Sequence, residues 1–273
     1  MGAEAPRPRA LTIAGSDSGG GAGIQADLKT FSALGVYGMT AITAVTVQNT
    51  RGVSGYQELP PDVVADQIRA VVTDIGVDAA KTGMLASARI AEAVAEAIAE
   101  TRIPNLVVDP VSVSKHGHRL LAEEAIDALR SRILPLATLV TPNLPEASGL
   151  AGLPVRSRDA MREAAHVILG MGPRAVLVKG GHLEGSAGAD DLLADADGIE
   201  WIHGERIDTP HTHGTGCTLS SAIAAHLALG AGLREAVHLG KAFVTEAIRH
   251  SMALGHGIGP VDPMWAVRRA DGS

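Results

Sequence analysis

The chain has a single cysteine and very few aromatic side chains. Its 273 residues include two tryptophans, two tyrosines and two phenylalanines. One cysteine excludes an internal disulfide bond and any paired-cysteine zinc site. The low aromatic content argues against the stacking platforms with which proteins bind single-stranded nucleic acid. The lack of cysteine pairs fits a reducing compartment, and we expect a cytoplasmic protein.

Positive charge and long apolar runs are also scarce. The chain has 23 Lys and Arg residues against 30 Asp and Glu residues, a formal net charge of −7. Nucleic-acid binding needs clustered positive charge, so we expect no nucleic-acid partner. The longest apolar stretch, 219–233, is interrupted by His226 and Gly230 and is too short to cross a bilayer. We therefore expect no membrane association, and residues 1–9 lack the apolar run of a secretory signal.

Short apolar runs alternate with stretches of helical periodicity along most of the chain. The runs that predict buried strands are 10–14, 39–47, 79–81, 106–108, 138–140 and 175–178. Continuous apolar strands that alternate with amphipathic helices predict a mostly parallel sheet covered on both faces, an α/β fold. Edge-type strands are expected near 55–56, 191–193 and 199–202. With no linker and no repeat, we expect one domain over 10–273 after a flexible tail, 1–9.

Polar or glycine residues follow nearly every predicted strand. They are Gly15 and Asp17, Gln48, Lys81 and Gly83, Asp109, Asn143 and Lys179. Because ligands of open α/β sheets bind outside the carboxyl ends of the strands, this convergence predicts a site at that edge.

A glycine-rich loop, 213–218, precedes a helical pattern that begins at Leu219. The backbone N–H groups and the dipole of a helix N-terminus favour an anion such as phosphate. The loop contains Cys217, and this position is expected to lower the pKa of its thiol. The alternative is a tight turn before a buried helix, with a small core cysteine.

Three residues after strand ends have the chemistry of a magnesium site. Asn143 and Glu146 share a face at a helix start, and Asp109 adds a second carboxylate. Mg²⁺ takes a few protein oxygens together with water and phosphates. The alternative is that Glu146 only complements the helix N-terminus.

Lys179 and Gln48 suggest partners for the ligand itself. A lysine at a buried strand end is costly unless it meets an anion, which favours a phosphate. The Gln48 amide has a donor and an acceptor, as recognition of a heteroaromatic edge requires, although a capped loop amide is the alternative. Four histidines lack zinc spacing and are expected on the surface or in loops: His182, His203, His211 and His213.

Several stretches together resemble a known family. They are residues 10–27 (ALTIAGSDSGGGAGIQAD), 47–50 (VQNT), 81–84 (KTGM), 141–147 (TPNLPEA), 179–182 (KGGH) and 213–218 (HGTGCT). They resemble the hydroxymethylpyrimidine/phosphomethylpyrimidine kinases of the ribokinase-like superfamily, from about Ala10 to Pro260. The resemblance implies a ribokinase-like three-layer α/β/α sandwich and a homodimer. It also implies two phosphorylations with ATP and Mg²⁺ in thiamine biosynthesis, of the pyrimidine alcohol and then of its monophosphate.

The resemblance also implies roles for individual residues. The pyrimidine pocket would use Gly15, Asp27, Gln48, Met84, Val111 and Cys217. The nucleotide and Mg²⁺ side would use Asp109, Asn143, Glu146 and Lys179. Gly214, Thr215 and Gly216 would line the anion hole, and Cys217 stands where related sugar kinases have an aspartate base. Residues 112–119 depart from the family's flap sequence. Two alternatives remain, a pyridoxal kinase and a non-catalytic pyrimidine or nucleotide sensor on the same fold.

Overall fold

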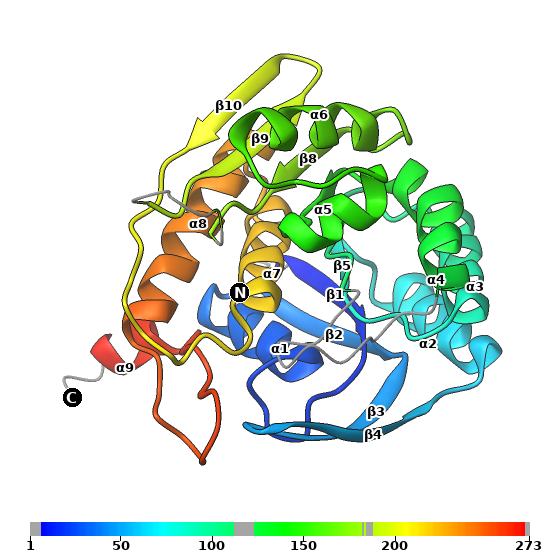
Figure 1. Cartoon of the computed structure of the whole chain (residues 1–273). Helices are drawn as coiled ribbons and strands as arrows, with labels where there is room; N and C mark the ends of the chain where they lie inside the picture. The colour runs from blue at the N-terminus through cyan, green and yellow to red at the C-terminus, as the bar shows by residue number, and fades with distance from the viewer. Residues whose placement is uncertain (1–6, 112–122, 182, 184–187, 271–273) are drawn as a thin grey trace, which may run out of the picture.

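The computed structural model describes residues 7–111, 123–181, 183 and 188–270. Within these residues, eight strands form one sheet in the order β10-β9-β8-β7-β6-β5-β1-β2 (Figure 1). Their bounds are β1 Arg9–Ala14, β2 Tyr37–Ile42, β5 Ala79–Thr82, β6 Leu106–Val108, β7 Leu139–Val140, β8 Ala175–Val178, β9 Asp191–Asp195 and β10 Gly198–Ile202. In this spatial order, the six strands β8, β7, β6, β5, β1 and β2 are parallel, whereas β9 and β10 are antiparallel to their neighbours. The expected mostly parallel sheet is confirmed.

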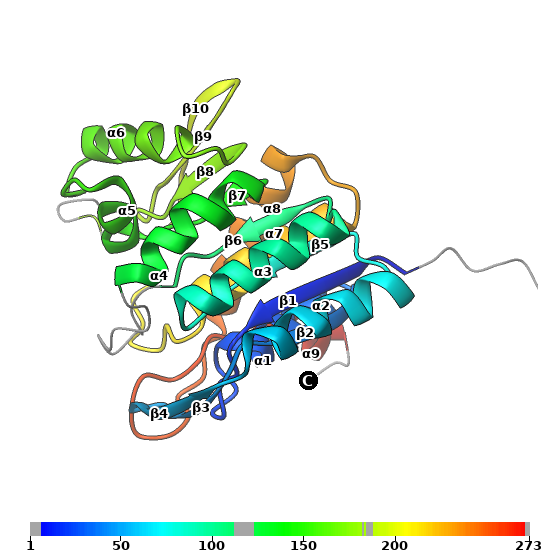
Figure 2. The same cartoon turned by 90° about the vertical axis from the view of Figure 1, so that its right-hand side faces the viewer.

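Helices cover both faces of this sheet (Figure 2). Their bounds are α1 Gly23–Ala33, α2 Pro61–Asp74, α3 Ala88–Thr101, α4 Glu123–Ala128, α5 Leu144–Ala151, α6 Arg158–Leu169, α7 Thr215–Ala228, α8 Leu233–Arg249 and α9 Trp265–Ala270. A π-helical turn, Leu129–Ile133, and a 3-10 turn, Leu134–Leu136, follow α4.

The core has one layer on each side of the sheet, because successive strand side chains point to opposite faces. Leu106 and Val108 of β6 belong to the core layer that contains buried residues of α2, α3 and α6, while Val107 belongs to the layer with those of α1, α7 and α8. This alternation confirms the three-layer α/β/α sandwich. No helix among the described residues has the length and hydrophobicity to cross a membrane.

The predicted strand 39–47 is two strands, and that prediction is wrong. β2 ends at Ile42, and β3 Ala44–Asn49 pairs with β4 Gly52–Glu58 in a separate two-stranded sheet. Thr43 lies between β2 and β3, where its N–H donates to Ala14 O and its hydroxyl to Met84 O. These two bonds hold the chain against the ends of the main sheet and turn it out of the sheet plane. The composition of 39–47 is typical of strand throughout, so no pattern marked the break.

Two other expectations need correction. β9 is not an edge strand, because it lies between β8 and β10 and its first four residues are buried. The helix expected from Leu219 begins at Thr215, after an N-cap at Gly214 with φ of 83°. Glycine is the residue that adopts this left-handed conformation without steric cost. Thr215, Gly216 and Cys217 therefore form the first turn of α7 rather than a loop before it.

Candidate active site

At the carboxyl ends of β6, β7 and β8, an aspartate, a lysine and the start of helix α5 lie close together. Asp109 follows β6, and its Oδ1 accepts hydrogen bonds from Lys179 Nζ at 2.9 Å and from the Thr141 hydroxyl at 3.3 Å. Lys179 follows β8, and its Nζ also lies 4.0 Å from Glu146 Oε2. The predicted convergence of Asp109, Lys179 and Glu146 at this edge is therefore seen in the structure.

The charge of Lys179 is set by its two carboxylate neighbours. Burial lowers the pKa of the ammonium, but Asp109 and Glu146 outweigh burial, so the pKa lies above the ordinary lysine value. Lys179 is thus a fixed cation, as binding of phosphate requires.

Asn143 and Glu146 form a capping box at the start of α5. Asn143 Oδ1 accepts from the Glu146 N–H at 2.9 Å, and Glu146 Oε2 accepts from the Asn143 N–H at 2.8 Å. The helix-capping alternative for Glu146 is therefore confirmed. A capping role does not remove the carboxylate from the site, since Glu146 Oε2 also faces Lys179. The magnesium role of Asn143, Glu146 and Asp109 stays a prediction.

The first turn of α7 lies directly against this charged cluster. A Cβ on Gly216 would lie 3.4 Å from Lys179 Nζ and 3.5 Å from Asp109 Oδ2. A Cβ on Gly214 would lie 1.8 Å from the carbonyl oxygen of Gly21. Close backbone approach requires glycine at position 214, whereas position 216 is only in contact with the two charged side chains. The N–H groups of a helix's first turn have no partner within the helix. The N–H groups of this turn therefore lie close to Lys179, at the position where an anion hole is expected.

The expectation for the Cys217 thiol is wrong in direction. Burial raises its pKa to about 11, although Lys81 acts to lower it, and the carboxylates Asp27 and Asp109 add to the increase. The backbone N–H of Gly23 donates to the sulfur and lowers the pKa only slightly by comparison. Desolvation thus outweighs the helix N-terminus on which the expectation rested. At neutral pH the side chain is a thiol.

Asp27 is fully buried. Its carboxylate accepts from Lys81 Nζ at 3.0 Å and from the hydroxyls of Thr12 and Ser221, both at 2.6 Å. Lys81 is also fully buried, and Asp27, Cys217 and Asp109 raise its pKa above the ordinary value in spite of burial. The contact of Asp27 with a pyrimidine stays a prediction, and Lys81 beside it is equally buried.

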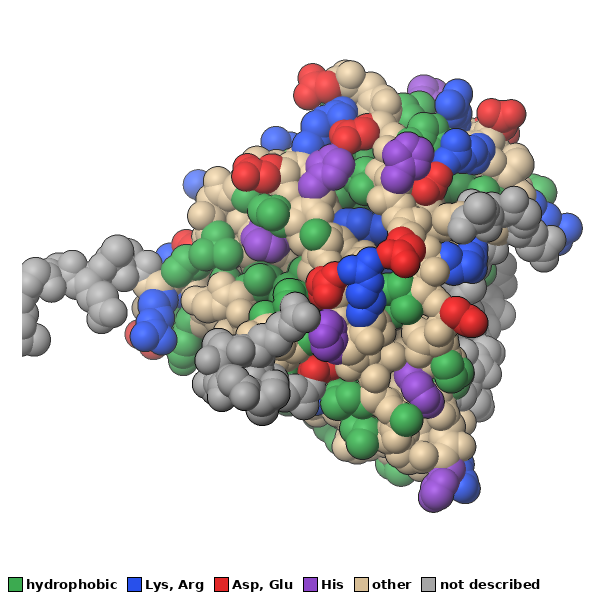
Figure 3. All heavy atoms as spheres, turned by 90° about the vertical axis from the view of Figure 1, so that its left-hand side faces the viewer, with side chains coloured by type: hydrophobic (Ala, Val, Ile, Leu, Met, Phe, Trp, Pro, Cys, Tyr) green, Lys and Arg blue, Asp and Glu red, His purple; other side chains and the backbone are tan. Residues whose placement is uncertain are grey.

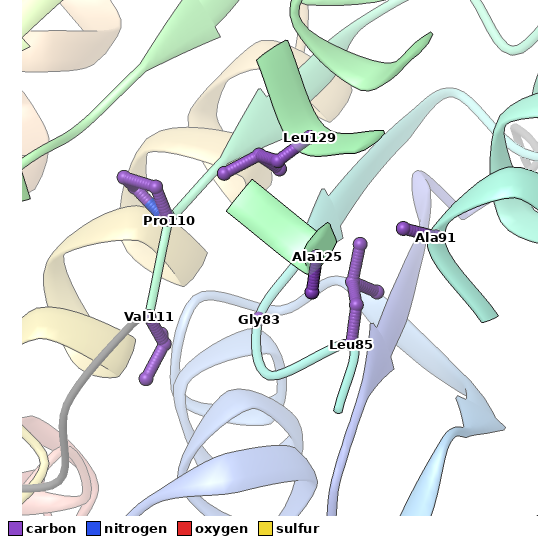
Figure 4. A pocket seen from close by; sticks show the side chains of 7 residues that line it. All are labelled: Gly83, Leu85, Ala91, Pro110, Val111, Ala125 and Leu129. Atoms are coloured by element: carbon purple, nitrogen blue, oxygen red, sulfur yellow. The ribbon is translucent and has the colours of Figure 1, made fainter. Parts of the chain in front are cut away.

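The remaining expected pocket residues lie at the ends of β1, β3, β5 and β6. A Cβ on Gly15 would contact the Met84 sulfur at 3.6 Å, so these two residues are adjacent. Val111 lies beside Gly83 at a small hollow of about 10 Å³, whose other lining residues are Leu85, Ala91, Pro110, Ala125 and Leu129 (Figure 4). This apolar hollow is at the lower limit for a single water molecule, so it is not a ring-binding site.

His213 lies in the loop before α7, as expected, but it is buried there rather than exposed. It is 6% exposed, and its Nε2 lies 2.8 Å from Asp17 Oδ2 and 3.4 Å from Gln48 Nε2. Among the other histidines, His203 is exposed and His211 is half-buried, as expected of surface and loop positions, and His182 lies outside the described residues. The flap, 112–119, also lies outside them.

Sequence reasoning placed Asp17 and Lys81 at this edge of the sheet but did not predict their partners, His213 and Asp27. Lys81 offered a signal, because a lysine inside the apolar run 79–82 must have a buried counterion. His213 and Asp17 are 196 positions apart, and only the fold shows that they meet.

The oxygen atoms at this site fit Mg²⁺. Asp109 and Glu146 present carboxylates around one ammonium, and hard oxygen ligands are those that Mg²⁺ prefers. Within the part of the chain that the structure describes, no three His, Cys, Asp or Glu side chains gather as a metal site. A magnesium ion here would therefore depend on water and phosphate oxygens for most of its ligands.

Residues 17–262 match the family model described as phosphomethylpyrimidine kinase. The match spans well over half of the chain. The chain belongs to the phosphomethylpyrimidine kinase family. A hydroxymethylpyrimidine/phosphomethylpyrimidine kinase of Streptomyces coelicolor is 55% identical over 260 residues, which cover 95% of this chain and 96% of the relative. The kinase membership expected from the sequence is thereby confirmed.

Solved structures of two relatives have the same fold. A pyridoxal kinase of Bacillus subtilis in complex with ADP has a TM-score of 0.89 and 44% identity, covering 96% of this chain and 99% of that one. A phosphomethylpyrimidine kinase of Clostridium difficile has a TM-score of 0.80 and 46% identity, covering 89% of this chain and 100% of that one. The ribokinase-like fold is confirmed. The names of these relatives contain two different ring substrates, pyridoxal and phosphomethylpyrimidine.

Proposed function

We propose that this chain transfers the γ-phosphoryl group of Mg-ATP to 4-amino-5-hydroxymethyl-2-methylpyrimidine, and then a second phosphoryl group to the monophosphate, in thiamine biosynthesis. The observation that supports phosphoryl transfer most directly is the Lys179–Asp109 pair beneath the first turn of α7. Such transfer needs alignment and charge neutralisation more than covalent chemistry. A half-buried cation, a helix N-terminus and two carboxylates in one place supply both.

The nucleotide side of the proposed site consists of Lys179, Asp109, Asn143 and Glu146. Lys179 would neutralise the transferred phosphoryl group, and Asp109 and Glu146 would bind the hydrated Mg²⁺ that ATP brings. The ion would supply charge neutralisation on the phosphate oxygens. The backbone N–H groups of Gly214, Thr215, Gly216 and Cys217 would stabilise the charge that develops in the transition state.

The pyrimidine side consists of Gly15, Gln48, Met84 and Val111, with Asp27 and Lys81 behind it. Cys217 lies in the first turn of α7, next to Gly216, whose Cα faces Lys179 and Asp109. We propose that Cys217 accepts the proton of the attacking hydroxyl. With a pKa of about 11, the thiolate that would accept this proton is about one part in ten thousand at pH 7, so the contribution of the base increases with pH.

Pyridoxal phosphorylation is the second candidate function. The pyridoxal kinase of Bacillus subtilis matches with a higher TM-score than the phosphomethylpyrimidine kinase of Clostridium difficile, 0.89 against 0.80. Both relatives have this fold and nearly the same identity to the chain, so these comparisons do not decide between the two substrates. A sensor without catalysis is disfavoured because Cys217, Asp109 and Lys179 are all present.

We further propose a homodimer in the cytoplasm, without nucleic-acid or membrane partners. The β3–β4 ribbon extends from the main sheet (Figure 2), and Val45 and Val47 on one of its faces are 50% and 63% exposed. Exposed apolar side chains on such a ribbon favour an interface with a second copy. On the face shown in Figure 3, acidic, basic and histidine side chains are interspersed, which supports small-molecule rather than nucleic-acid binding.

A substrate panel tests the function. Purified protein with Mg-ATP is assayed for ADP release with hydroxymethylpyrimidine, its monophosphate, pyridoxal and ribose. We expect the highest kcat/KM with the two pyrimidines. A higher kcat/KM for pyridoxal would instead establish the second candidate.

A further inference from the structure

Asp17 and His213 form a buried pair that ties together two glycine loops. Asp17 is 1% exposed, and its Oδ2 accepts from His213 Nε2 at 2.8 Å and from the N–H groups of Gly21 and Ala22 at 3.1 and 2.8 Å. Its Oδ1 accepts from the Gly19 N–H at 2.8 Å. These bonds outweigh burial and hold the pKa of Asp17 below the usual aspartate value. The carboxylate is therefore ionised at neutral pH.

An ionised acceptor fixes the hydrogen on the imidazole. Because Asp17 has no proton to give, the 2.8 Å bond requires that His213 Nε2 is the donor. The imidazole also packs against Gly21, where a Cβ would lie 2.5 Å from His213 Cδ2. The backbone of His213 bonds to Gly259 O and Val261 N. The imidazole ring is therefore held in one position, with a proton on Nε2.

The fixed imidazole contacts the amide of Gln48. His213 Nε2 lies 3.4 Å from Gln48 Nε2, and Thr46 Oγ1 lies 3.4 Å from Gln48 Oε1. The Nε2 hydrogen of His213 is already donated to Asp17, and the Thr46 hydroxyl donates to Ser16 O at 2.8 Å. His213 therefore presents an N–H to the amide, and Thr46 presents oxygen lone pairs. The Gln48 amide meets both neighbours favourably only when its last bond is turned so that its oxygen faces His213 and its NH2 faces Thr46. Each end of the amide then keeps a further lone pair or hydrogen for a ligand.

We propose that Asp17 and His213 are a positioning pair for substrate affinity, which holds the Gln48 amide in the orientation that meets the ring edge of the pyrimidine. This inference rests on the proposed function of Gln48 as the residue that hydrogen-bonds the ring. The pair acts through Gln48 and touches neither ATP nor the reacting atoms. Its loss therefore changes the KM of the ring substrate and leaves the KM of ATP unchanged.

A double-mutant cycle of His213 and Gln48 tests whether the pair acts through the Gln48 amide. His213→Leu keeps much of the side-chain volume but removes the donor, whereas His213→Gln retains an N–H donor for Asp17. We expect His213→Leu to raise the KM of the ring substrate about tenfold, as for coupled neighbours, while the KM of ATP stays within about twofold. His213→Gln should restore most of the affinity. In a Gln48→Ala background, His213→Leu should have no further effect on the KM of the ring substrate.

Two results overturn the inference. One is an unchanged KM of the ring substrate in His213→Leu, and the other is a loss of equal size with and without Gln48. If His213→Leu does not fold, Gly21→Ala enters the same cycle, because its Cβ displaces the imidazole while His213 remains. The KM is measured for whichever ring alcohol the wild-type protein phosphorylates. If the wild type does not phosphorylate the pyrimidine, only the proposed function is rejected. The mutant cycle separately shows whether Asp17 and His213 position Gln48.

Discussion

Lys179 Nζ and Asp109 Oδ1 lie 2.9 Å apart at the ends of two strands, with Gly216 of α7 directly above them. Asp109 is 3% exposed, and Lys179 is its ion-pair partner. The pair is thus both an element of the fold and the proposed phosphate site. The two roles have separable consequences.

Substitution of Lys179 should reduce both stability and activity. Lys179→Met leaves a buried carboxylate unpaired, which costs about 3 kcal/mol of unfolding free energy, and removes the cation, which lowers kcat by about 10²–10³-fold. Adding Asp109→Asn should restore most of the stability without restoring activity. Urea unfolding and ATP kinetics measure the two effects, with Arg69→Met on exposed α2 as a control. Recovery of activity together with stability would assign the pair a purely structural role.

Glu146 offers a sharper test of the magnesium site. Glu146→Gln keeps an acceptor for the Asn143 N–H and therefore preserves the capping box, but it removes the carboxylate charge. If Glu146 binds Mg²⁺, this variant should require a several-fold higher Mg²⁺ concentration for half-maximal rate, with an unchanged melting temperature. Titration of Mg²⁺ at fixed ATP gives the midpoint. An unchanged midpoint would leave Glu146 with its helix cap alone.

The role of Cys217 should appear in the pH dependence of turnover. Because burial raises the thiol pKa to about 11, the thiolate fraction increases about tenfold per pH unit between pH 7 and 9. If the thiolate is the base, log kcat of the wild type rises with pH in this range, and Cys217→Ala lowers kcat by about 10²-fold and flattens the profile. Near-full turnover of Cys217→Ala at saturating substrate would show that the side chain only packs against the substrate.

The same pKa predicts how stability changes with pH. The folded thiol has a higher pKa than the unfolded thiol, so the folded state binds more protons between the two values. This contribution of Cys217 to stability is present below the unfolded pKa and decreases as pH rises through about 8.5 to 11. Cys217→Ala should therefore show a smaller loss of unfolding free energy over that interval.

The homodimer can be tested on the β3–β4 ribbon. We expect the wild type to elute at twice the mass of the chain in size-exclusion chromatography with light scattering. Val45→Lys with Val47→Lys should yield monomers, because two desolvated charges oppose the interface. Val63→Lys, on α2 and 44% exposed, is a matched control that should remain dimeric. A wild-type monomer at micromolar concentration would exclude the proposal.

The sequence predicted the sheet and the convergence of Asp109, Glu146 and Lys179 because strand ends and apolar runs are local features. It failed where long-range contacts decide. Thr43 breaks a strand-like run because of bonds to β1 and to Met84, and the Cys217 pKa rises because packing removes water from a helix N-terminus. The pair of Asp17 and His213 depends on the whole chain for its proximity. A propensity or a motif contains none of this information.

The most direct test of the central claim is a ³¹P NMR time course with purified protein, hydroxymethylpyrimidine and excess Mg-ATP. The account predicts that a pyrimidine monophosphate signal appears first and is then replaced by the two signals of the diphosphate, while an equal concentration of pyridoxal is phosphorylated more slowly. A monophosphate that accumulates without further conversion, or pyridoxal phosphate as the main product, would contradict it.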